Sequence, residues 1–324
     1  MTLLLTRSDI LAALNIPGAL DTLRAGFVQA TAIEPLRIRT DLPGPGTATT
    51  LLPGLIPGIP AYTVKVNAKF PAASPALRGI VCLHDLTDGT LLAVLDSTTI
   101  TAWRTGLAAA LATHLLACPV ASAVGQVGGL GGGQGFVVGV VGAGMQAGMV
   151  VGGLAELRDV QGLVVYDLDA ERSAQFLARQ GIPGSVASSP RAVATEADVV
   201  VLATWSREAL LSAGDVRPGL HLTTLGADEP GKVELSADLL AAARVVVDDR
   251  RLAVEMGALG NVGLSNDEVS ATLTEVLTGV APGRRTDDEV TVYAPVGLPW
   301  QDLAIAWPVF QAARGRGQVI DFLS

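Results

Sequence analysis

Short apolar runs alternate with helical patterns through the second half of the chain. Segments with helical spacing, such as residues 235–243, separate these runs. Short buried strands with helices between them are typical of a parallel sheet that is covered on both faces. The pattern therefore predicts an α/β fold with a Rossmann-type doubly wound parallel sheet. The runs are "FVVGVVGAG", "GLVVYD", "DVVVLAT", "HLTTLG" and "ARVVVDD", between Phe136 and Asp249.

A different pattern precedes this sheet. Period-two alternation predicts strands in "AYTVKVNAKF", "GIVCLHDL" and "TLLAVLD", and an Ala-rich helix, "TAWRTGLAAALATHLLA", follows them. This part of the chain is expected to form a separate α+β domain. A glycine-rich stretch from Gly125 to Gly135 joins the two regions. Because no strand leads into that stretch, we interpret it as a tether or loop and not as a second phosphate loop.

The run from Phe136 to Ala155 has Gln146 as its one polar residue and is long enough to raise the question of a membrane span. Its many glycines disfavour a spanning helix, and no basic cluster, second span or N-terminal signal peptide accompanies it. A span would also remove the first strand from the predicted sheet. We therefore expect a soluble, cytoplasmic protein.

Gly142, Gly144 and Ala147 form a G-x-G-x-x-A motif directly after the first predicted strand. The first glycine permits a tight turn, the second lets backbone N–H groups approach a pyrophosphate, and the small third residue lets the helix pack on the strand. Asp167 ends the next strand, where a carboxylate accepts from the adenosine ribose and repels a 2′-phosphate. The pattern therefore favours NAD over NADP. The alternative interpretation makes Asp167 the cap of the following helix.

Composition and charge argue against other classes of protein. The net charge is -9 and no Lys/Arg-rich patch occurs, so we expect no nucleic-acid partner. The chain has 2 cysteines and 3 histidines, too few for a metal cage or a dense disulfide framework. We predict no metal site.

Some charged residues in apolar surroundings are candidates for chemistry. Strand alternation places Lys65 on one face with Thr63 and Asn67, and that face is either solvated or part of a cleft. Arg104 is expected at the start of the Ala-rich helix, where its charge opposes the helix dipole and calls for an anion. Asp228 follows a strand at the carboxyl edge of the sheet, where such sheets bind ligands. Each of these residues also has a purely structural interpretation.

A series of segments is spread over nearly the whole chain: "PLRIRT", "VKVNAKFP", "LDSTTITAWRTGLAAALATHLLA", "VVGAGMQA", "LGADEPGKVEL" and "GRRTDDEVTVYAPVGLPWQDLA". In this order and at these spacings, they resemble the ornithine cyclodeaminase/mu-crystallin family. The resemblance implies a substrate-binding and dimerisation domain (residues 1–120 with 300–324) and a dinucleotide-binding Rossmann domain (residues 121–299). The C-terminal segment would return to the first domain, and we expect a homodimer.

The family implies NAD(P)-dependent chemistry at a carbon–nitrogen bond. Its catalytic lysine and aspartate match Lys65 and Asp228. Its substrate-carboxylate arginines match Arg37 and Arg104, although Arg39 is close enough to compete with Arg37. The cofactor-binding positions are Gly142, Gly144, Gln146, Ala147, Asp167 and Thr204.

These roles are chemically consistent. An arginine fork binds a carboxylate and fixes the α-carbon over the nicotinamide. Asp228 would carry the proton of the substrate amine, and Lys65 would polarise the substrate or orient a water after crowding with the arginines has lowered its pKa. A Schiff base on the lysine is not needed for hydride transfer.

The resemblance leaves the substrate open. Ornithine has a cationic tail, but residues 46–66 contain no acidic residue, and Leu52-Pro53 and Ala72-Ala73 replace pairs that are frequent in the family. We therefore favour NAD(H)-dependent chemistry on a small amino acid or its imine, including a cyclic imine. The alternatives are redox-neutral cyclisation of ornithine to proline plus ammonia, and a non-catalytic protein that binds NAD(P) or another small ligand. NADP in place of NAD is a smaller alternative, since Arg172 could reach a 2′-phosphate.

Overall fold

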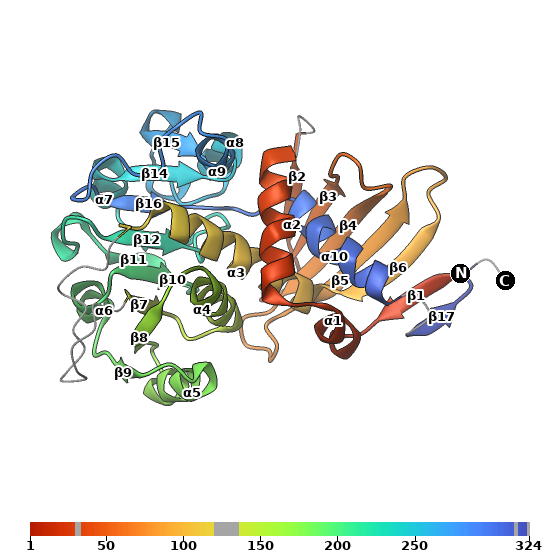
Figure 1. The fold of residues 1–324 in the computed structure, drawn as a ribbon, viewed down its shortest axis with the longest axis horizontal. Helices are drawn as coiled ribbons and strands as arrows, with labels where there is room; N and C mark the ends of the chain where they lie inside the picture. Colours follow the sequence, from red (N-terminus) through yellow and green to blue (C-terminus); the bar gives the residue numbers. More distant parts are fainter. Residues whose placement is uncertain (30–33, 120–135, 314–316, 323–324) are drawn as a thin grey trace. The chain divides into compact units, whose positions relative to one another are not determined.

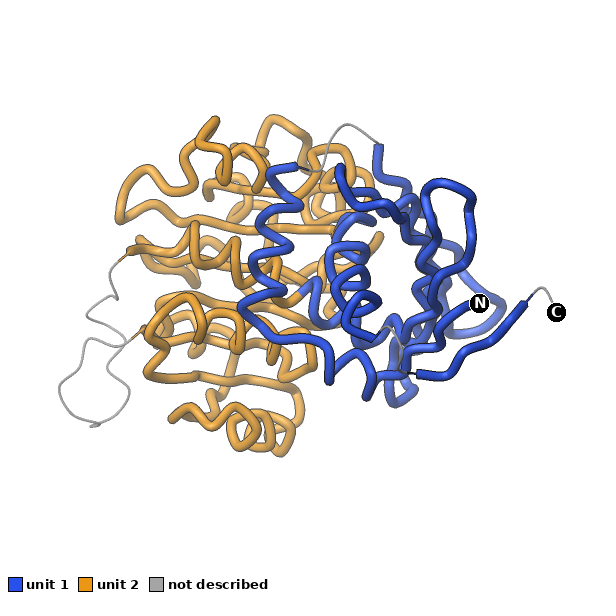
Figure 2. Tube along the Cα trace, turned by 45° about the vertical axis from the view of Figure 1, so that its right-hand side comes forward, with its two compact units in different colours: residues 1–105, 298–324 blue, residues 106–297 orange. Residues whose placement is uncertain are grey.

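The computed structural model describes residues 1–29, 34–119, 136–313 and 317–322. The chain divides into two compact units (Figure 2). Unit 1 comprises residues 1–105 and 298–324, and unit 2 comprises residues 106–297. The predicted tether from Gly125 to Gly135 lies outside the described residues.

Unit 1 is built on a seven-stranded sheet with the order β17-β1-β6-β5-β4-β3-β2 (Figure 1). β1 runs parallel to β6, and the other neighbouring pairs are antiparallel. The strands predicted from alternation correspond to β4, β5 and β6. The bounds are β1 Thr2–Leu5, β2 Leu36–Asp41, β3 Thr47–Gly54, β4 Ala61–Lys69, β5 Leu77–Asp85, β6 Leu91–Asp96 and β17 Gln318–Ile320.

The C-terminal helix belongs to unit 1. Helix α10 (Trp300–Ala312) packs on β3, β4 and β5 and contacts α1 (Arg7–Ala13) and α2 (Ile16–Gln29). The ring of Trp300 meets Phe27 of α2 edge-on, with 4.8 Å between the ring centroids. This packing holds the polar start of α10 against the strands.

Helix α3 (Ser97–Leu116) begins earlier than the Ala-rich pattern indicated. The carboxylate of Asp96, at the end of β6, accepts hydrogen bonds from the N–H groups of Thr98 and Thr99 and so caps the helix. The β-branched residues of this first turn are weak helix formers, which hid the true start. Arg104 therefore lies well inside α3 and not at its start, so the expected conflict with the helix dipole does not arise.

Unit 2 is built on an eight-stranded sheet with the order β15-β14-β16-β12-β10-β7-β8-β9, in which all neighbouring pairs are parallel (Figure 1). The chain runs outward from β7 through β8 to β9 on one side, and continues at β10 and β12 on the other. The strand order therefore reverses between β7 and β10, which confirms the predicted doubly wound sheet. The bounds are β7 Phe136–Val141, β8 Val160–Tyr166, β9 Gly184–Val186, β10 Val199–Leu202, β12 His221–Thr224, β14 Arg244–Val247, β15 Val269–Thr272 and β16 Thr291–Tyr293; β11 Arg207–Leu211 and β13 Val233–Leu235 form a separate parallel pair.

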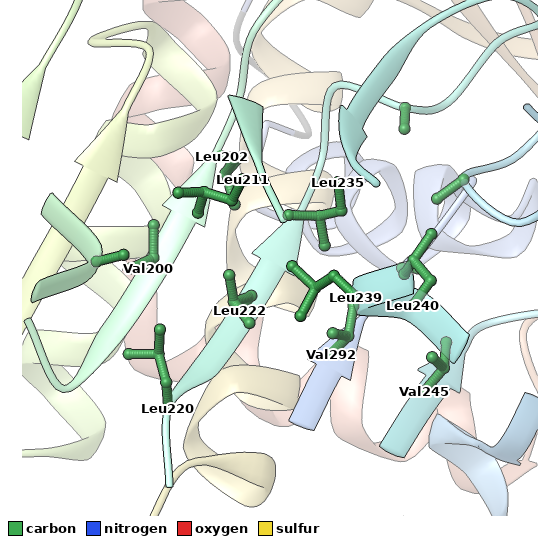
Figure 3. Close-up of a cluster of buried hydrophobic side chains, with 14 of the residues drawn as sticks. Val200, Leu202, Leu211, Leu220, Leu222, Leu235, Leu239, Leu240, Val245 and Val292 are labelled. Carbon is green, nitrogen blue, oxygen red and sulfur yellow. The ribbon is translucent and has the colours of Figure 1, made fainter. Parts of the chain in front are cut away.

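Aliphatic side chains fill the core beside this sheet. Val200, Leu222, Val292 and Val245 come from adjacent strands, and Leu239 of helix α7 (Ala237–Ala242) lies among the same buried cluster (Figure 3). Such close packing fixes the carboxyl ends of the strands relative to one another. The helices of unit 2 are α4 Met145–Leu157, α5 Ala170–Gln180, α6 Pro190–Glu196, α7 Ala237–Ala242, α8 Arg250–Glu255 and α9 Leu273–Leu277, with short 3-10 helices η1 Ala213–Asp215, η2 Gly260–Val262 and η3 Asn266–Glu268.

The apolar run at residues 136–155 forms strand β7 and most of helix α4, with the glycine turn between them. In the part of the chain that the structure describes, no helix is both long and apolar enough to cross a membrane. The hydropathy of this run comes from a buried strand and the helix beside it.

Candidate active site

The G-x-G-x-x-A motif forms the turn between β7 and α4. Gly142 has a φ of 94°, and a Cβ on it would lie 2.6 Å from the carbonyl oxygen of Ala203, so both conformation and space require glycine. Gly144 is the N-cap of α4 without a side chain to accept its first N–H groups, and a Cβ there would meet open space. Gln146 and the fully buried Ala147 follow in the first turn. The open helix N-terminus fits a phosphate group.

Asp167 follows β8 beside this turn. Its Oδ2 accepts a hydrogen bond from the N–H of Ala143 at 2.9 Å, and its Oδ1 accepts from the N–H of Asp169 at 3.2 Å. The cap of α5 is Asp169, whose side chain accepts from the N–H of Glu171, so the helix-cap alternative for Asp167 is wrong. The guanidinium of Arg172 lies 3.9 Å from Asp167 and is 57% exposed. Asp167 thus holds the glycine turn at the end of its strand.

Thr204 follows β10 and is bound to a side chain that the sequence reasoning missed. The N–H and the hydroxyl of Thr204 both donate to Oε1 of Glu234, at 2.6 and 2.7 Å. Glu234 belongs to β13 and is fully buried. The available signal was an acidic residue between the apolar residues Val233 and Leu235 of a short strand.

Asp228 lies after β12, at the carboxyl edge of the unit 2 sheet. Its Oδ1 lies 3.0 Å from Nζ of Lys232, and the Asp228 side chain is 23% exposed. The same Nζ lies 3.7 Å from Oε2 of Glu229 and 4.3 Å from the ring centroid of Trp205. An ion pair therefore orients Asp228. Lys232 was not among the predicted site residues, although it stands in the quoted "GADEPGKVEL" segment.

Lys65 projects from β4 on the buried face of the unit 1 sheet. Lys65, Thr63 and Asn67 are 0%, 1% and 4% exposed, whereas the intervening Val66 is 46% exposed. The predicted alternation is confirmed. The interpretation of this face as a solvated strand face is wrong.

A buried ion cluster surrounds the ammonium of Lys65. Its Nζ lies 2.8 Å from Oδ1 of Asp302, and Nε of Arg104 lies 3.4 Å from the same oxygen. Nη1 of Arg104 donates to Oε1 of Gln301 at 3.0 Å, and Oγ1 of Thr101 lies 3.5 Å from Nζ. The structure therefore brings Lys65 and Arg104 together through an aspartate that the sequence reasoning did not name. The missed signal was the pair Gln301-Asp302 at the start of an otherwise apolar helix.

The surroundings of Lys65 lower its pKa to about 7. Burial away from water is the largest cause, and the positive charges of Arg104 and Arg37 act in the same direction, while Asp302 raises the pKa. Of these causes, only the crowding by arginines was predicted from the sequence. A lysine with this pKa can hold or release a proton near neutral pH.

The strand register distinguishes the two candidate arginines of β2. Arg37 pairs across the sheet with Leu51 of β3, and Leu51 pairs in turn with Lys65 of β4, so these residues form one row. Arg39 lies in the next row, where its Nη2 donates to Oδ1 of Asp41 at 2.6 Å. Arg37 is also the β2 arginine whose charge acts on the pKa of Lys65. These contacts favour Arg37 over Arg39 as the candidate arginine of β2 for binding the substrate carboxylate.

Several buried polar atoms on the Lys65 face accept or donate no hydrogen bond within the described residues. They are Oδ2 of Asp302, Oδ1 of Asn67, and the hydroxyl oxygens of Thr49 and Thr63. Folded proteins seldom leave such atoms unpaired, and water or a small polar ligand would satisfy them. We therefore define the Lys65 face, with these four residues, as the candidate ligand-binding surface of unit 1.

His221 is fully buried in unit 2, away from the carboxyl edge of the strands. Its Nδ1 lies 2.8 Å from Oγ1 of Thr291, and its Nε2 lies 3.0 Å from Oγ1 of Thr223. Burial, and after it the charges of Arg284 and Arg158, hold the pKa of His221 well below its usual range. Across the described ranges, no group of three or more His, Cys, Asp or Glu side chains could hold a metal ion.

The chain is similar to a known protein family and to solved structures of other proteins. The model of the ornithine cyclodeaminase/mu-crystallin family matches residues 4–317. Alanine dehydrogenase of Archaeoglobus fulgidus is 33% identical over 247 residues, which cover 74% of this chain and 71% of that protein. The structure of Thermococcus litoralis Δ1-pyrroline-2-carboxylate reductase with NADH and L-proline has a TM-score of 0.89 and 25% identity, covering 98% of this chain and 100% of that one. An archaeal alanine dehydrogenase dimer with bound NAD has a TM-score of 0.88 and 27% identity, covering 99% of each chain.

Proposed function

The chain belongs to the ornithine cyclodeaminase/mu-crystallin family, and we propose that it is an NAD(H)-dependent oxidoreductase acting on the carbon–nitrogen bond of a small amino acid or its imine. The observation that carries the proposal is the buried Lys65, paired with Asp302 beside Arg104, with a pKa of about 7. Perturbed lysines of this kind are typical of sites that move protons. The names of the similar proteins, an alanine dehydrogenase and a pyrroline-2-carboxylate reductase, support the same class of reaction.

Unit 2 is the part that would hold NAD. The glycines of the β7–α4 turn leave room for the pyrophosphate at the N-terminus of α4, with Gln146 in its first turn. Asp167 has a carboxylate with lone pairs beyond its two backbone contacts, which suits the ribose hydroxyls and repels a 2′-phosphate. Thr204 lies after β10, across the strand reversal. When bound, the nicotinamide supplies or accepts the hydride.

Unit 1 would bind the substrate. The guanidinium groups of Arg37 and Arg104 suit a carboxylate, because a guanidinium donates two parallel hydrogen bonds to it. Contacts with Gln301 and Asp302 orient Arg104. A substrate fixed by its carboxylate presents its α-carbon in one orientation, which hydride transfer requires.

Two further side chains would handle protons. Asp228 accepts the proton that the substrate nitrogen loses on oxidation, and returns it in the reductive direction. Lys65 in its protonated form polarises the carbon–nitrogen bond or orients a water, and Asp302 fixes its ammonium. Neither role needs a covalent bond between Lys65 and the substrate.

The substrate side chain is proposed to be small or uncharged, or closed into a cyclic imine. The Lys65 face presents the hydroxyls of Thr49 and Thr63 and the amide of Asn67, and the buried carboxylate of Asp302 already binds Lys65. Asp41 and Asp85, the acids that flank residues 46–66 in the sequence, both bind other groups. Asp41, which is 76% exposed, accepts from Arg39, and Asp85 accepts from the N–H of Thr87.

The test follows NADH absorbance after addition of the purified protein to cyclic imino acids, and to 2-oxo acids with ammonia or methylamine. We expect consumption with at least one member of this panel, and loss of consumption in Lys65→Met. If NADH binds but no member is reduced, and ornithine instead yields proline without net NADH change, the redox-neutral alternative replaces the proposal. If NADH binds and neither reaction occurs, a binding protein replaces it.

We also propose that the protein is a homodimer formed through the second face of the unit 1 sheet. Ile38, Val66 and Ile80 lie in one cross-strand row with Thr50, and the three aliphatic residues are 56%, 46% and 44% exposed. An apolar row across adjacent strands is a surface that association would bury. The dimeric state of the similar archaeal alanine dehydrogenase supports this proposal.

A further inference from the structure

Glu234 is a buried carboxylate that receives hydrogen bonds from two different loops. Its Oε1 accepts from the N–H and the hydroxyl of Thr204, at 2.6 and 2.7 Å. Its Oε2 accepts from the hydroxyl of Thr224 and the N–H of Gly226, at 2.7 and 2.8 Å. The side chain is fully buried. The carboxylate therefore joins the chain after β10 to the chain after β12.

The two loops approach each other closely at this point. A Cβ on Gly226 would lie 2.3 Å from the carbonyl oxygen of Thr204 and 2.3 Å from Oε1 of Glu234, so a larger residue does not fit there. The N–H of Leu225 also donates to the carbonyl of Leu202 at 2.8 Å. Glu234 thus closes a tightly packed junction at the carboxyl edge of the sheet.

A carboxylate is the side chain that this junction requires. Each oxygen faces two donors, and two of the four donors are backbone N–H groups that cannot accept. An ionised carboxylate accepts at both oxygens, whereas an amide would turn an NH₂ group toward donors. Hydrogen bonds to a charged acceptor are also stronger than neutral ones, which suits a junction that must stay rigid.

The position of the junction relates it to the cofactor. In a doubly wound sheet the dinucleotide lies across the strand reversal, one mononucleotide half on each side. The glycine turn after β7 and Asp167 after β8 lie on one side of the reversal, and β10 and β12 lie on the other. The loops that Glu234 joins are therefore those under the nicotinamide half, and the β12 loop continues to Asp228.

We propose that Glu234 is a positioning residue for the nicotinamide half of NAD, which it couples to the loop of Asp228. This inference rests on the proposed function, because it takes NAD as the cofactor. It does not give Glu234 any contact with the reacting atoms. Its effect passes through Thr204 on one side and Gly226 on the other.

The test compares the binding of NADH with that of ADP-ribose, which lacks the nicotinamide, by titration calorimetry on the full-length protein. We expect Glu234→Gln to weaken NADH binding by about tenfold or more, since it disturbs bonds to a charged group, and to leave ADP-ribose binding unchanged within about twofold. The matched control is Asp198→Asn. Asp198 is a buried carboxylate of the same unit that accepts from the N–H of Val137, a residue of β7, and it lies at the amino end of β10. Asp198→Asn should leave the ratio of the two affinities unchanged.

Equal weakening of both ligands by Glu234→Gln, or no weakening of either, would overturn the inference. If Glu234→Gln does not fold, Glu234→Asp keeps the charge but is too short to reach both loops, and the same change in the affinity ratio is expected. An unchanged ratio in the folded Asp variant, or its failure to fold as well, would assign Glu234 to stability and not to positioning. Failure of the proposed function is distinguishable, because the wild-type protein would then not bind NADH at all or would bind it without reducing any imine.

Discussion

Asp302 places a carboxylate oxygen 2.8 Å from the ammonium of Lys65, although 237 residues separate the two in the sequence. The two side chains are 0% and 1% exposed, and Arg104 approaches the same oxygen. Two cations thus share one buried anion. Because guanidinium does not give up its proton under ordinary conditions, the lysine is the group whose protonation responds to the surplus of positive charge.

The Lys65–Asp302 pair predicts a pH dependence of catalysis. Asp302 raises the pKa of Lys65 against the effect of burial, so Asp302→Asn is expected to move the pKa from about 7 to a lower value. The matching inflection in kcat/KM for imine reduction should move by roughly one unit toward acid. Lys65→Arg is the control, since arginine does not titrate in this range and the inflection should vanish. An inflection that stays in place in both variants would contradict the role of Lys65.

Asp167 predicts the choice between the two cofactors. Asp167→Asn removes the negative charge that repels a 2′-phosphate, while Arg172 stays 3.9 Å from the altered group. We expect the ratio of the NADP to the NAD dissociation constant to fall by about tenfold or more, as hydrogen bonds to charged groups predict. Fluorescence titration measures both constants. Asp169→Asn, which alters the cap of α5 instead, should leave the ratio unchanged. Equal ratios in the two variants would refute the assignment.

The ion pair between Lys232 and Asp228 leads us to expect that Asp228 needs Lys232 to hold its carboxylate in place. Lys232→Met removes the cation 3.0 Å from Asp228 while keeping a chain that packs on Trp205. We expect kcat to fall by about tenfold or more, because a misplaced proton acceptor loses much of its contribution, with NADH affinity unchanged. Arg191→Met, at a pair on the surface of the same unit where Arg191 is 73% exposed, is the control. A normal kcat in Lys232→Met would show that Asp228 needs no such support.

The exposed row on the unit 1 sheet predicts the oligomeric state. Val66→Glu places a charge within this row and is expected to convert the proposed dimer to a monomer, because burying an unpaired charge is costly. Sedimentation velocity measures the change. Val186→Glu is the matched control, since Val186 is 44% exposed on β9 of unit 2. A wild-type protein that is already monomeric, or a Val66→Glu variant that remains a dimer, would remove this face as the interface.

His221 predicts a loss of stability in acid. Its pKa is well below the usual value in the folded protein, so its stabilising contribution is complete above about pH 6.5, the ordinary value, and is lost as the pH falls. Between about pH 6.5 and the lowered pKa of the folded state, this group alone should reduce the free energy of unfolding by about 1.4 kcal/mol for each pH unit of acidification. At neutral pH the free energy of unfolding of His221→Asn is expected to be lower than that of the wild type. The difference between the two proteins should decrease as the pH falls below about 6.5. Urea titrations at several pH values measure it, and a constant gap would be inconsistent with a neutral buried His221.

Local patterns in the sequence predicted the parts of the fold that depend on local periodicity. Alternation placed Lys65 on one face with Thr63 and Asn67, which the structure shows to be the buried face. The apolar runs of unit 2 became strands of one parallel sheet. These local patterns could not predict the strand order of that sheet, because β16 comes from a later part of the chain and lies between β12 and β14. Asp302 was missed for the same reason, since no local pattern connects residues so far apart. Arg104 was misplaced relative to its helix because a capping contact outweighed weak helix formers.

Deuterium transfer tests the central claim most directly. The protein is incubated with NADH carrying deuterium at each C4 position and with the cyclic imino acid that it reduces, and the product is examined by mass spectrometry. Hydride transfer between the nicotinamide and the α-carbon predicts an amino acid with one deuterium, located at the α-carbon. A product without deuterium, formed while NADH is consumed, would contradict the proposed reaction.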